Sequence, residues 1–321
     1  MKAIYFNKAG DPLEVLSVGE FDPPIAGPGE VRIKVMSSPI NPADLLFIKG
    51  KYRYQPKFPQ IAGLEGTGII EDAGSDVALP VTTPISFLWR NTWAEYTVVP
   101  EEELVILPAG FPVEKAAQMA LNPFTAWGLL ERIALHKDEW LLLTAGSSVV
   151  SQLVIQLAAH KGIRVIATVR DDKQKDRLDR LGAEVIDLSV EELEKRVLEI
   201  TDGKGVEGAL DAVGGPTATA LLKCMAINGK VVDYAALSTE PFQAHNSLFV
   251  YKNISLSGFG IRGYLSSKTR QEKADIAQQL TGIMAKDDFR LDVAAKFSMT
   301  DIKPALLEAQ RSHNGKVLLT F

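Results

Sequence analysis

Short apolar runs alternate with amphipathic segments through the middle of the chain, from residue 121 to residue 257. Each run has the length and apolar character of a strand buried on both faces, and each segment between two runs has helical spacing. The runs are WLLLT, IRVIATV, AEVIDL, VEGALDAV, KVVDYAAL and ISLSGF. Strands that alternate with helices in this way predict an α/β domain with a doubly wound parallel sheet.

A different pattern occupies the two ends of the chain. Residues 1–120 consist of short alternating segments, such as EVRIKVMSS and GTGIIEDAG, interrupted by prolines and glycines. This pattern predicts an irregular, mostly β domain. From residue 258 onward the chain has one helical pattern, KADIAQQLTGIMAK, and a closing strand, KVLLTF. We therefore predict one domain from residues 1–120 and 258–321, and a second domain from residues 121–257.

Composition and charge narrow the function classes. The 321 residues carry a net charge of −5 with both signs interspersed, so no basic stripe marks a nucleic-acid or membrane surface. The chain shows no signal-peptide pattern and no apolar run of membrane-spanning length, and we expect a cytoplasmic protein. The single cysteine, Cys224, excludes an internal disulfide. The four histidines stand far apart, without the spacing of metal ligands, so the sequence predicts no protein-held metal. They are His136, His160, His245 and His313.

The turn after the first strand of the α/β domain contains one glycine, Gly146. Rossmann dinucleotide sites use several glycines there, so that the backbone approaches the pyrophosphate while the next helix supplies N–H groups and a positive dipole. The following positions of this loop are Ser147, Ser148, Val149, Val150 and Ser151. The serine hydroxyls either donate to a phosphate or cap the helix, so the loop alone leaves both interpretations open.

The end of the second strand indicates which cofactor such a site prefers. An acid there binds the ribose 2′-hydroxyl of NAD, whereas an arginine accommodates the 2′-phosphate of NADP. Val169 stands in the place of the acid and Arg170 follows it. This favours NADPH, with Arg170 as the phosphate ligand. The alternative is that Arg170 is an ordinary surface residue and that Asp171 is the displaced acid.

Two stretches resemble a known family. They are PINPADLLFIKGKYRYQPKFPQIAGLEGTGIIEDAGSDV at 39–77 and NPFTAW at 122–127. Both are similar to the zinc-free branch of the medium-chain dehydrogenase/reductase superfamily, and above all to its mitochondrial-type 2-enoyl thioester reductases and NADPH:quinone reductases. The resemblance extends over the whole chain through LDAVGG, LSGFG and GKVLL. It implies a GroES-like catalytic domain beside a Rossmann domain, and a homodimer in which the strand near residues 252–258 pairs with its copy.

The resemblance also implies that the zinc ligands of related dehydrogenases are replaced in this chain. Zinc-dependent alcohol dehydrogenases have a cysteine where this chain has Asn41, and a histidine where it has Leu64. Both ligands are therefore replaced. Without a Lewis acid to hold an alkoxide, reduction of an already polarised double bond becomes the expected reaction.

A tyrosine in the INP-A-D…I-x-G-x-Y pattern of the enoyl reductases donates a proton to the substrate α-carbon, and by position it is Tyr52. A phenol suits this role because it is protonated at neutral pH yet acidic enough to quench an enolate. Tyr54 is a rival, since it shares the same face of an extended segment. A tyrosine at either place also suits simple packing with a solvated hydroxyl.

Further residues are carried over from the family. Asn41 and Thr125 should lie beside the nicotinamide and its ribose, whereas Gly214, Tyr234 and Phe259 should line the cofactor cleft. From the residues alone, Asn41 before a proline also suits a turn, and Tyr234 after a strand also suits the core. Tyr52, Asn41 and Thr125 are thus the candidate catalytic residues. The cofactor set joins Asn41 and Thr125 with Ser147, Ser148, Val149, Val150, Arg170, Gly214, Tyr234 and Phe259.

The chain departs from the family pattern at three places. The relatives have glycines where this chain has Val149 and Ser151, the stretch ALPVTTPISFLW replaces a Gly-Asp-Arg-Val segment, and Gly260 replaces a tryptophan. The sequence therefore predicts a reductase of activated C=C bonds that uses NADPH on a small-molecule substrate, above all an enoyl thioester. Quinone reduction is the first alternative. A non-catalytic nucleotide-binding or regulatory relative is the second.

Overall fold

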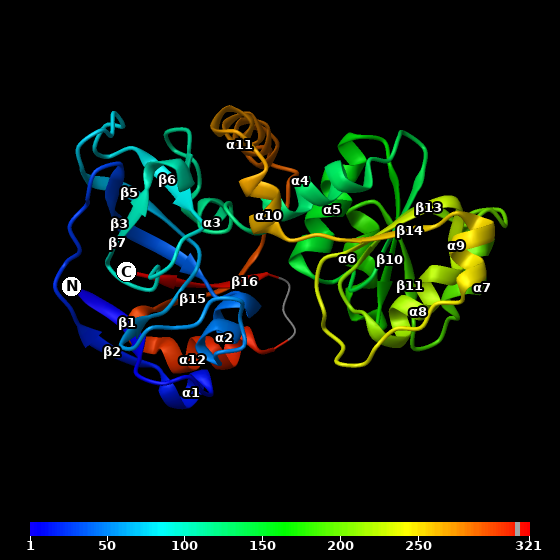
Figure 1. Cartoon of the computed structure of the whole chain (residues 1–321), viewed down its shortest axis with the longest axis horizontal. Coiled ribbons are helices and arrows are strands. Elements are labelled where there is room, and N and C mark those ends of the chain that lie inside the picture. The colour runs from blue at the N-terminus through cyan, green and yellow to red at the C-terminus, as the bar shows by residue number, and fades with distance from the viewer. Residues whose placement is uncertain (312–314) are drawn as a thin grey trace. The chain divides into compact units, whose positions relative to one another are not determined.

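A computed structural model describes residues 1–311 and 315–321, and the chain divides into two compact units (Figure 1). Unit 1 comprises Met1–Asn122 and Thr269–Phe321, and unit 2 comprises Pro123–Lys268. Unit 2 runs to Lys268, whereas the sequence pattern placed the boundary at 257. The extension follows from side-chain contacts, because Tyr264 and Lys268 both bind Glu131 in the first helix of this unit.

Unit 2 is built on a six-stranded sheet in which every neighbouring pair is parallel. The strand order is β11-β10-β9-β12-β13-β14, the order of a Rossmann sheet. The predicted α/β fold class is confirmed. The strands are β9 (Trp140–Leu143), β10 (Arg164–Val169), β11 (Ala183–Asp187), β12 (Val206–Asp211), β13 (Met225–Asp233) and β14 (Ser255–Gly258).

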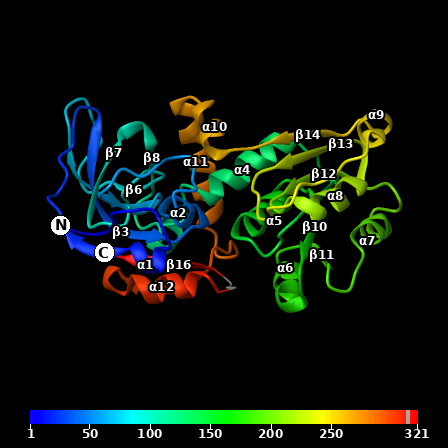
Figure 2. The ribbon, with the colours of Figure 1, turned by 60° about the horizontal axis from the view of Figure 1, so that its bottom comes forward.

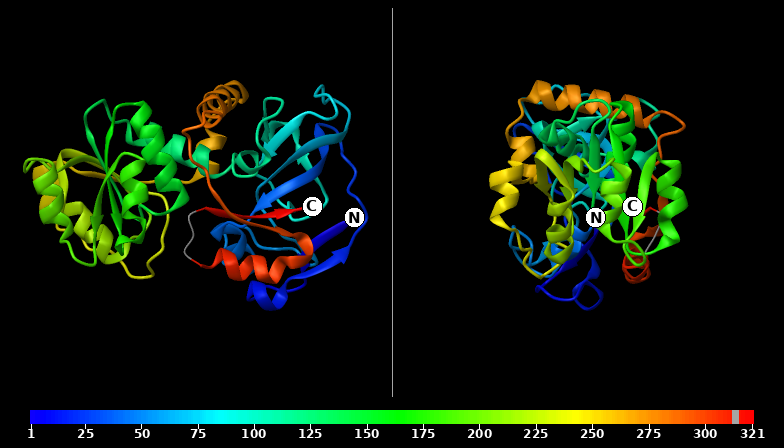
Figure 3. Two further views of the ribbon diagram at one scale, coloured as in Figure 1. Left: turned by 180° about the vertical axis from the view of Figure 1, so that it is seen from behind. Right: turned by 90° about the vertical axis from the view of Figure 1, so that its right-hand side faces the viewer.

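Helices cover both faces of this sheet (Figure 3). Leu142, Ile166, Ala209 and Val231 are register partners on four neighbouring strands and lie in one buried cluster. Strands enclosed on both faces carry near-continuous apolar runs, which is why the sequence pattern was clear here. The helices are α4 (Asn122–Ile133), α5 (Val149–His160), η2 (Asp172–Gln174), α6 (Lys175–Arg180), α7 (Leu193–Ile200), α8 (Gly215–Lys223), α9 (Asn246–Lys252) and α10 (Ile261–Ser266).

Unit 1 is mostly β. A seven-stranded sheet has the order β15-β16-β3-β5-β6-β8 with β7 paired to β3, and a three-stranded sheet has the order β2-β1-β4. The strands are β1 (Lys2–Phe6), β2 (Ser17–Glu20), β3 (Glu30–Pro39), β4 (Gln60–Ile61), β5 (Gly66–Ala73), β6 (Pro84–Phe87), β7 (Tyr96–Pro100), β8 (Leu104–Ile106), β15 (Val293–Ser298) and β16 (Lys316–Thr320).

The two ends of the chain meet in unit 1. β16 pairs antiparallel with β3, with Leu319 opposite Ser38. In Figure 2 the C-terminal helix α12, in red, lies beside the N-terminal helix α1, in blue. The helices of this unit are α1 (Pro12–Val15), α2 (Pro42–Ile48), η1 (Glu101–Glu103), α3 (Val113–Ala116), α11 (Arg270–Met284), η3 (Met299–Asp301) and α12 (Ile302–Ala309). In the described part of the chain, no helix is both long and apolar enough to cross a membrane.

Candidate active site

The amino end of α2 fixes Asn41, one of the residues singled out in the sequence. Asn41 is the N-cap residue and Pro42 follows at the first helical position, where a proline is pre-organised for the helix. The Asn41 N–H donates to Asp44 Oδ2 at 2.7 Å, and the Asp44 N–H donates back to the Asn41 carbonyl at 3.0 Å. Both side chains are buried. Sequence and burial thus hold Asn41 in one defined position.

Glu65 connects Asn41 to the segment before α4. Asn41 Nδ2 donates to Glu65 Oε2 at 2.8 Å, and the Leu121 N–H donates to Glu65 Oε1 at 2.7 Å. Glu65 is fully buried, so both bonds form away from water. The turn Gly63-Leu64-Glu65-Gly66 owes its shape to Gly63, whose φ is +90° and where a Cβ would lie 2.3 Å from Thr92 Oγ1.

Burial is the main influence on the proton affinity of the ionisable groups near Asn41. Burial raises the pKa of Asp44 and the pKa of Glu65 to about 7, although hydrogen bonds and the Lys316 ammonium act in the opposite direction. Burial also lowers the pKa of Lys316, against the attraction of both carboxylates. Burial therefore moves the pKa of both carboxyls toward neutral pH. Perturbed groups of this kind are common at functional sites.

Tyr52 lies in the loop that follows α2. Its side chain is half-buried and packs on the core cluster of unit 1, as does that of Tyr54. The two ring centroids are 5.8 Å apart in an edge-to-face arrangement, and the Arg53 guanidinium lies 5.6 Å from the Tyr52 ring and 5.1 Å from the Tyr54 ring. The tyrosines thus contact each other, and geometry alone does not separate them.

In unit 2, hydroxyl groups gather at the amino end of α5. Ser148 is the N-cap residue and its Oγ accepts from the Ser151 N–H at 3.1 Å. Ser151 Oγ lies 3.0 Å from Ser148 Oγ and 3.4 Å from the Tyr234 hydroxyl. Ser147 is exposed, and its carbonyl accepts from Gln152 Nε2 at 2.8 Å. Three hydroxyls therefore replace the bare glycine backbone expected of this turn.

Gly146 has a packing reason to be glycine. Its N–H donates to the Thr168 carbonyl at 2.8 Å, and a Cβ there would lie 2.9 Å from the Ala167 Cβ. Close approach of the turn to β10 is one of the roles of glycine in dinucleotide folds. The preceding Ala145 has φ +48°, a left-handed conformation that costs energy for any residue with a Cβ.

Arg170 and Asp171, the two residues that follow β10, have different surroundings in the structure. Asp171 accepts from the Lys173 N–H at 3.2 Å as the cap of η2, and its other oxygen pairs with the Lys173 ammonium at 3.6 Å. Arg170 is exposed and has no ion-pair partner among residues 1–311 and 315–321. Asp171 thus has a structural role, whereas Arg170 is available to an anion.

The carboxyl end of β12 holds Gly214. The Gly214 N–H donates to Asp211 Oδ2 at 2.8 Å, and Asp211 Oδ1 accepts from the Thr144 hydroxyl at 2.5 Å. Gly214 has φ +75° and ψ −162°, a region that essentially only glycine adopts. β9, β10, β12 and β13 are parallel, so Thr144, Arg170, Gly214 and Tyr234 all follow strands that end at the same edge of the sheet.

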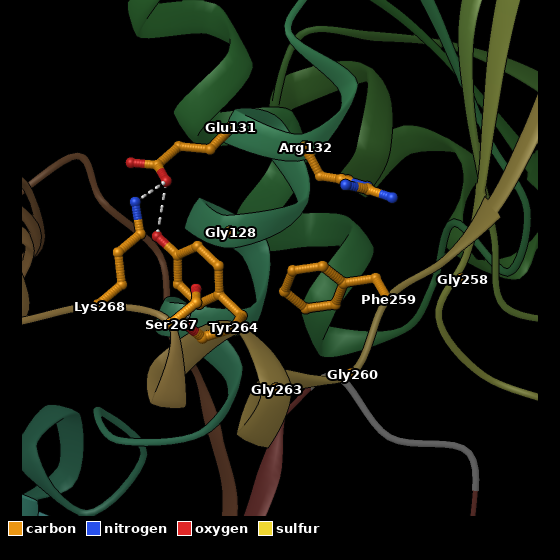
Figure 4. A pocket seen from close by; sticks show the side chains of 10 residues that line it. All are labelled: Gly128, Glu131, Arg132, Gly258, Phe259, Gly260, Gly263, Tyr264, Ser267 and Lys268. Atoms are coloured by element: carbon orange, nitrogen blue, oxygen red, sulfur yellow. Dashed lines mark hydrogen bonds and ion pairs between the residues drawn. The ribbon is translucent and has the colours of Figure 1, made fainter.

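Phe259 lines a pocket of about 430 Å³ that lies wholly in unit 2 (Figure 4). Its ring centroid is 5.6 Å from that of Tyr264, and a Cβ on Gly128 would lie 2.7 Å from Phe259 Cζ. Glu131 accepts from the Tyr264 hydroxyl and the Lys268 ammonium, both at 2.9 Å. Thr125 is buried in the same helix as Gly128, one turn earlier.

Sequence reasoning missed the buried partners of the predicted residues. Asp44, Glu65 and Lys316 form the charged cluster around Asn41, and Asp211 binds the Gly214 backbone. Glu65 had a detectable signal, since it is the only charged residue in the stretch IAGLEGTGII. In the part of the chain that the structure describes, no group of three or more His, Cys, Asp or Glu residues is arranged to hold a metal ion. His313 lies outside that part.

Two family models match the chain. The model described as "Alcohol dehydrogenase GroES-like domain" matches residues 27–109, and the one described as "Zinc-binding dehydrogenase" matches residues 149–279. The mitochondrial enoyl-[acyl-carrier-protein] reductase of Dictyostelium discoideum is 30% identical, over 90% of this chain and 85% of that protein. Its human counterpart is 29% identical, over 100% of this chain and 89% of that protein.

Solved structures of quinone reductases are also similar. A NADPH:quinone reductase from Bacillus thuringiensis superposes with a TM-score of 0.93 at 30% identity, over 100% of this chain and 98% of that chain. The fold, the residues at the zinc-ligand positions and these matches agree with one another. The chain therefore belongs to the zinc-free branch of the medium-chain dehydrogenase/reductase superfamily and is an oxidoreductase.

Proposed function

We propose that this protein is an NADPH-dependent reductase of activated C=C bonds and that its preferred substrates are 2-enoyl thioesters. The curated relatives at about this level of identity are named as enoyl-[acyl-carrier-protein] reductases. Two residues of unit 1 support this chemistry. The hydrogen-bonded amide of Asn41 and the apolar side chain of Leu64 stand where zinc-dependent alcohol dehydrogenases have two zinc ligands.

That observation carries the proposal. Asn41 is tied to Glu65 at 2.8 Å and Leu64 is buried in the core cluster, so neither position offers a soft ligand for zinc. A site without a Lewis acid does not stabilise an alkoxide, and it suits a substrate whose double bond is already polarised by a carbonyl. Enoyl thioesters and quinones both meet this requirement.

The residues of unit 2 fit a dinucleotide. The amino end of the twelve-residue helix α5 presents N–H groups together with the hydroxyls of Ser148 and Tyr234, which are suited to a pyrophosphate, and the buried Ser151 hydroxyl contacts both. Arg170 is exposed at the end of β10 and suits a 2′-phosphate. NADPH, when bound, supplies the hydride. We assign Ser147, Val149, Val150, Gly214 and Phe259 to the lining of this site in unit 2, and the family resemblance implies a cofactor role for Thr125 and, separately, for Asn41.

Tyr52 is the proposed proton donor. Reduction of an enoyl thioester requires one proton at the α-carbon, and a phenol can deliver it. The half-buried ring is held by the core of unit 1 and by Tyr54, so its orientation is restricted before substrate binds. Restricting a reacting group in this way lowers the entropy that is lost on reaching the transition state.

Steady-state rates of NADPH oxidation with crotonyl-CoA and with 1,4-benzoquinone test the proposal directly. We expect the thioester to give the higher kcat/KM. A protein that reduces only the quinone is a quinone reductase, the function named for the Bacillus thuringiensis and Escherichia coli structures to which this chain is similar.

Quinone reduction is the second candidate because the solved structures to which the chain is similar include quinone reductases. Gly260 stands where the resemblance places a tryptophan, and a Cβ there would meet no atom within 4 Å. A fluorescence titration with NADPH decides whether either activity is available. Absence of binding at millimolar NADPH would contradict both and leave a non-catalytic relative.

A further inference from the structure

Two carboxyl groups meet at the carboxyl end of the parallel sheet in unit 2. They belong to Asp211, the last residue of β12, and Asp233, the last residue of β13, which are register partners in these neighbouring strands. The Tyr234 N–H donates to the Asp211 carbonyl at 3.0 Å, so the backbone fixes this end of the pair of strands. The two carboxyls are hydrogen-bonded to each other. One of them must therefore hold a proton, because an ionised carboxylate only accepts.

The surroundings decide which of the two carboxyls holds the proton. Asp211 is fully buried, and its Oδ1 accepts from the Thr144 hydroxyl at 2.5 Å and from the Val213 N–H at 3.0 Å. Its Oδ2 accepts from the Gly214 N–H at 2.8 Å. A carboxylate with several donors keeps its charge. Asp233 Oδ1 is also shielded from water, but it accepts no hydrogen bond from the part of the chain that the structure describes. The proton therefore belongs on Asp233, whose carboxyl donates to Asp211.

The electrostatics of the pair agree with this assignment. Burial, the hydrogen bond to Asp211 and the negative charge of Asp211 all raise the pKa of Asp233, to about 6. Burial also raises the pKa of the nearby Tyr234 hydroxyl, so this group stays neutral. Below about pH 6 the pair therefore carries one negative charge, and above it the second carboxyl loses its proton.

Other ionisable side chains on the neighbouring elements make their contacts elsewhere. β14, on the other side of β13, has none. Glu207 accepts from the Trp140 N–H at the amino end of β9, and the Lys252 ammonium donates to the Met225 carbonyl at the amino end of β13. The Lys230 ammonium donates to the Ile133 carbonyl. The remaining ones lie on α8, on α9 and in the loop after β13, and they are Lys223, Tyr251 and the exposed Glu240 and His245. The two aspartates thus set the charge of their own pair.

The pair is joined by hydrogen bonds to both turns of the proposed cofactor site. Asp211 holds the N–H of Gly214, whose φ of +75° and ψ of −162° define the turn before α8. Asp211 also accepts from Thr144, whose carbonyl accepts from the Ser151 hydroxyl in the first turn of α5 at 3.3 Å. A second negative charge beside Asp211 would repel it, and it would also repel an anionic dinucleotide at this edge of the sheet.

We propose that Asp233 is a positioning residue for the cofactor: while it holds the shared proton, it keeps Asp211 and the Gly214 turn in place, and dinucleotide binding at neutral pH therefore takes up a proton. This role rests on the proposed use of NADPH. The sign follows from linkage. Free protein loses the proton as pH rises through the pKa of Asp233, so a ligand that needs the protonated pair binds more weakly at higher pH.

Calorimetric titrations with NADP⁺, in buffers of different ionisation enthalpy, count the protons taken up on binding. At about pH 7 the wild-type protein should take up a measurable fraction of one proton more than Asp233→Asn, because the asparagine amide donates to Asp211 without titrating. From about pH 6 to 7.5 the wild-type Kd for NADP⁺ should rise by up to about tenfold per pH unit relative to that of Asp233→Asn. This comparison cancels the titration of the ligand's 2′-phosphate, which has a pKa of about 6.

Two further variants separate positioning from general charge effects. Glu240→Gln removes one exposed carboxyl from the loop after β13 and should keep the proton uptake and the pH dependence of the wild-type protein. Asp233→Leu removes the charge and the donor together. It should bind NADP⁺ more weakly than Asp233→Asn at every pH, because only the amide restores the hydrogen bond to Asp211. The wild-type protein with NAD⁺, which lacks the 2′-phosphate, should also take up a proton at about pH 7.

Several outcomes would overturn this role of Asp233. Equal proton uptake by the wild-type protein and Asp233→Asn shows that Asp233 does not titrate with binding. Equal Kd values for Asp233→Asn and Asp233→Leu show that its hydrogen bond does not position the turn. If Asp233→Asn does not fold, the wild-type protein decides alone, and absence of proton uptake with NAD⁺ refutes the role. A wild-type protein that binds no NADP⁺ at millimolar concentration at any pH contradicts the proposed function itself, and that result is distinct from the others.

Discussion

At the scale of single residues, the candidate site is defined by what each side chain already contacts. Asn41 and Glu65 are held by buried hydrogen bonds, Tyr52 by packing, and Arg170 by nothing described in the structure. A residue fixed before binding contributes by pre-organisation, whereas an exposed arginine gains its partner only when the ligand arrives. This difference decides what each substitution should change.

Replacing Tyr52 tests the proton donor. Tyr52→Phe should lower kcat for crotonyl-CoA by about 10²- to 10⁴-fold, because general acid catalysis is lost while the ring packing is kept. Quinone reduction should change little, since the oxyanion of a reduced quinone can take its proton from water. Tyr54→Phe is the matched control and should cost less than about tenfold. A larger loss at Tyr54 than at Tyr52 would show that the two roles are exchanged.

Replacing Arg170 tests cofactor choice. Arg170→Ala should weaken NADPH binding by about ten- to a hundredfold, because one charge-assisted hydrogen bond to the 2′-phosphate is removed. The Kd for NADH should stay nearly constant, since NADH has no such phosphate. Fluorescence titrations with both cofactors give the two values. Equal losses for both would mean that Arg170 does not bind the 2′-phosphate.

The Glu65 carboxyl makes stability depend on pH. Its pKa is about 7 in the folded protein and near 4.5 when exposed, so between these values the folded state holds more protons than the unfolded chain. The free energy of unfolding therefore falls as pH rises through this window, and Asp44 acts in the same direction. Glu65→Gln should make the decline shallower by up to about 1.4 kcal/mol per pH unit.

Denaturant unfolding at a series of pH values between about 5 and 7 measures this slope. Glu114→Gln is a suitable control, because a hydrogen bond from Lys296 lowers the pKa of Glu114 and its contribution lies at lower pH. A Glu65→Gln variant with the wild-type slope would show that the buried carboxyl does not hold a proton near neutral pH.

At the scale of elements, the turn between β9 and α5 combines strain with capping. Ser148 caps α5 and Gly146 allows the turn to approach β10, but Ala145 adopts a left-handed conformation that glycine would adopt without cost. The element therefore stores strain at a place where a phosphate is expected to bind.

Ala145→Gly should raise the free energy of unfolding by about 1 kcal/mol, because it relieves the positive φ of +48°. Ala159→Gly is the control, at an exposed position in the last turn of α5, and should lower the free energy of unfolding by less than about 1 kcal/mol. Chemical denaturation gives both values. A destabilised Ala145→Gly variant would mean that the Ala145 methyl group makes contacts that outweigh the strain.

At the scale of the whole molecule, the open question is the assembly. β14 pairs with β13 on one side and ends the described sheet on the other, and most of its residues are exposed. An exposed edge of a parallel sheet readily pairs with another strand. We propose a homodimer in which β14 pairs with its copy. Light scattering should give twice the chain mass, and Leu256→Glu should shift it toward the monomer. A wild-type monomer at micromolar concentration would refute the pairing.

The sequence by itself determined the strands of unit 2, because enclosure on both faces requires long apolar runs that periodicity detects. The family resemblance of its contiguous motifs also singled out Asn41 and Tyr52 as candidate site residues, and the strand-turn-helix pattern singled out the serine-rich turn. The sequence predicted the strands of unit 1 less clearly, because they are short and half-exposed. β16 also pairs with β3 from far away in the sequence: the Ser37 hydroxyl donates to the Leu319 carbonyl across 282 positions.

Only the tertiary structure decided which partners the predicted residues have. Glu65 meets Asn41 from 24 positions away, and Ser151 meets Tyr234 from 83 positions away. Such contacts depend on how strands and loops pack, and no local spacing encodes them. Burial then sets the pKa of Glu65 and Asp44, because desolvation is a property of the surroundings and not of the residue. The loop at residues 49–57 shows the reverse case. Its lysines and arginine are visible in the sequence, but their exposure and the position of Arg53 beside the Tyr52 ring come from the fold.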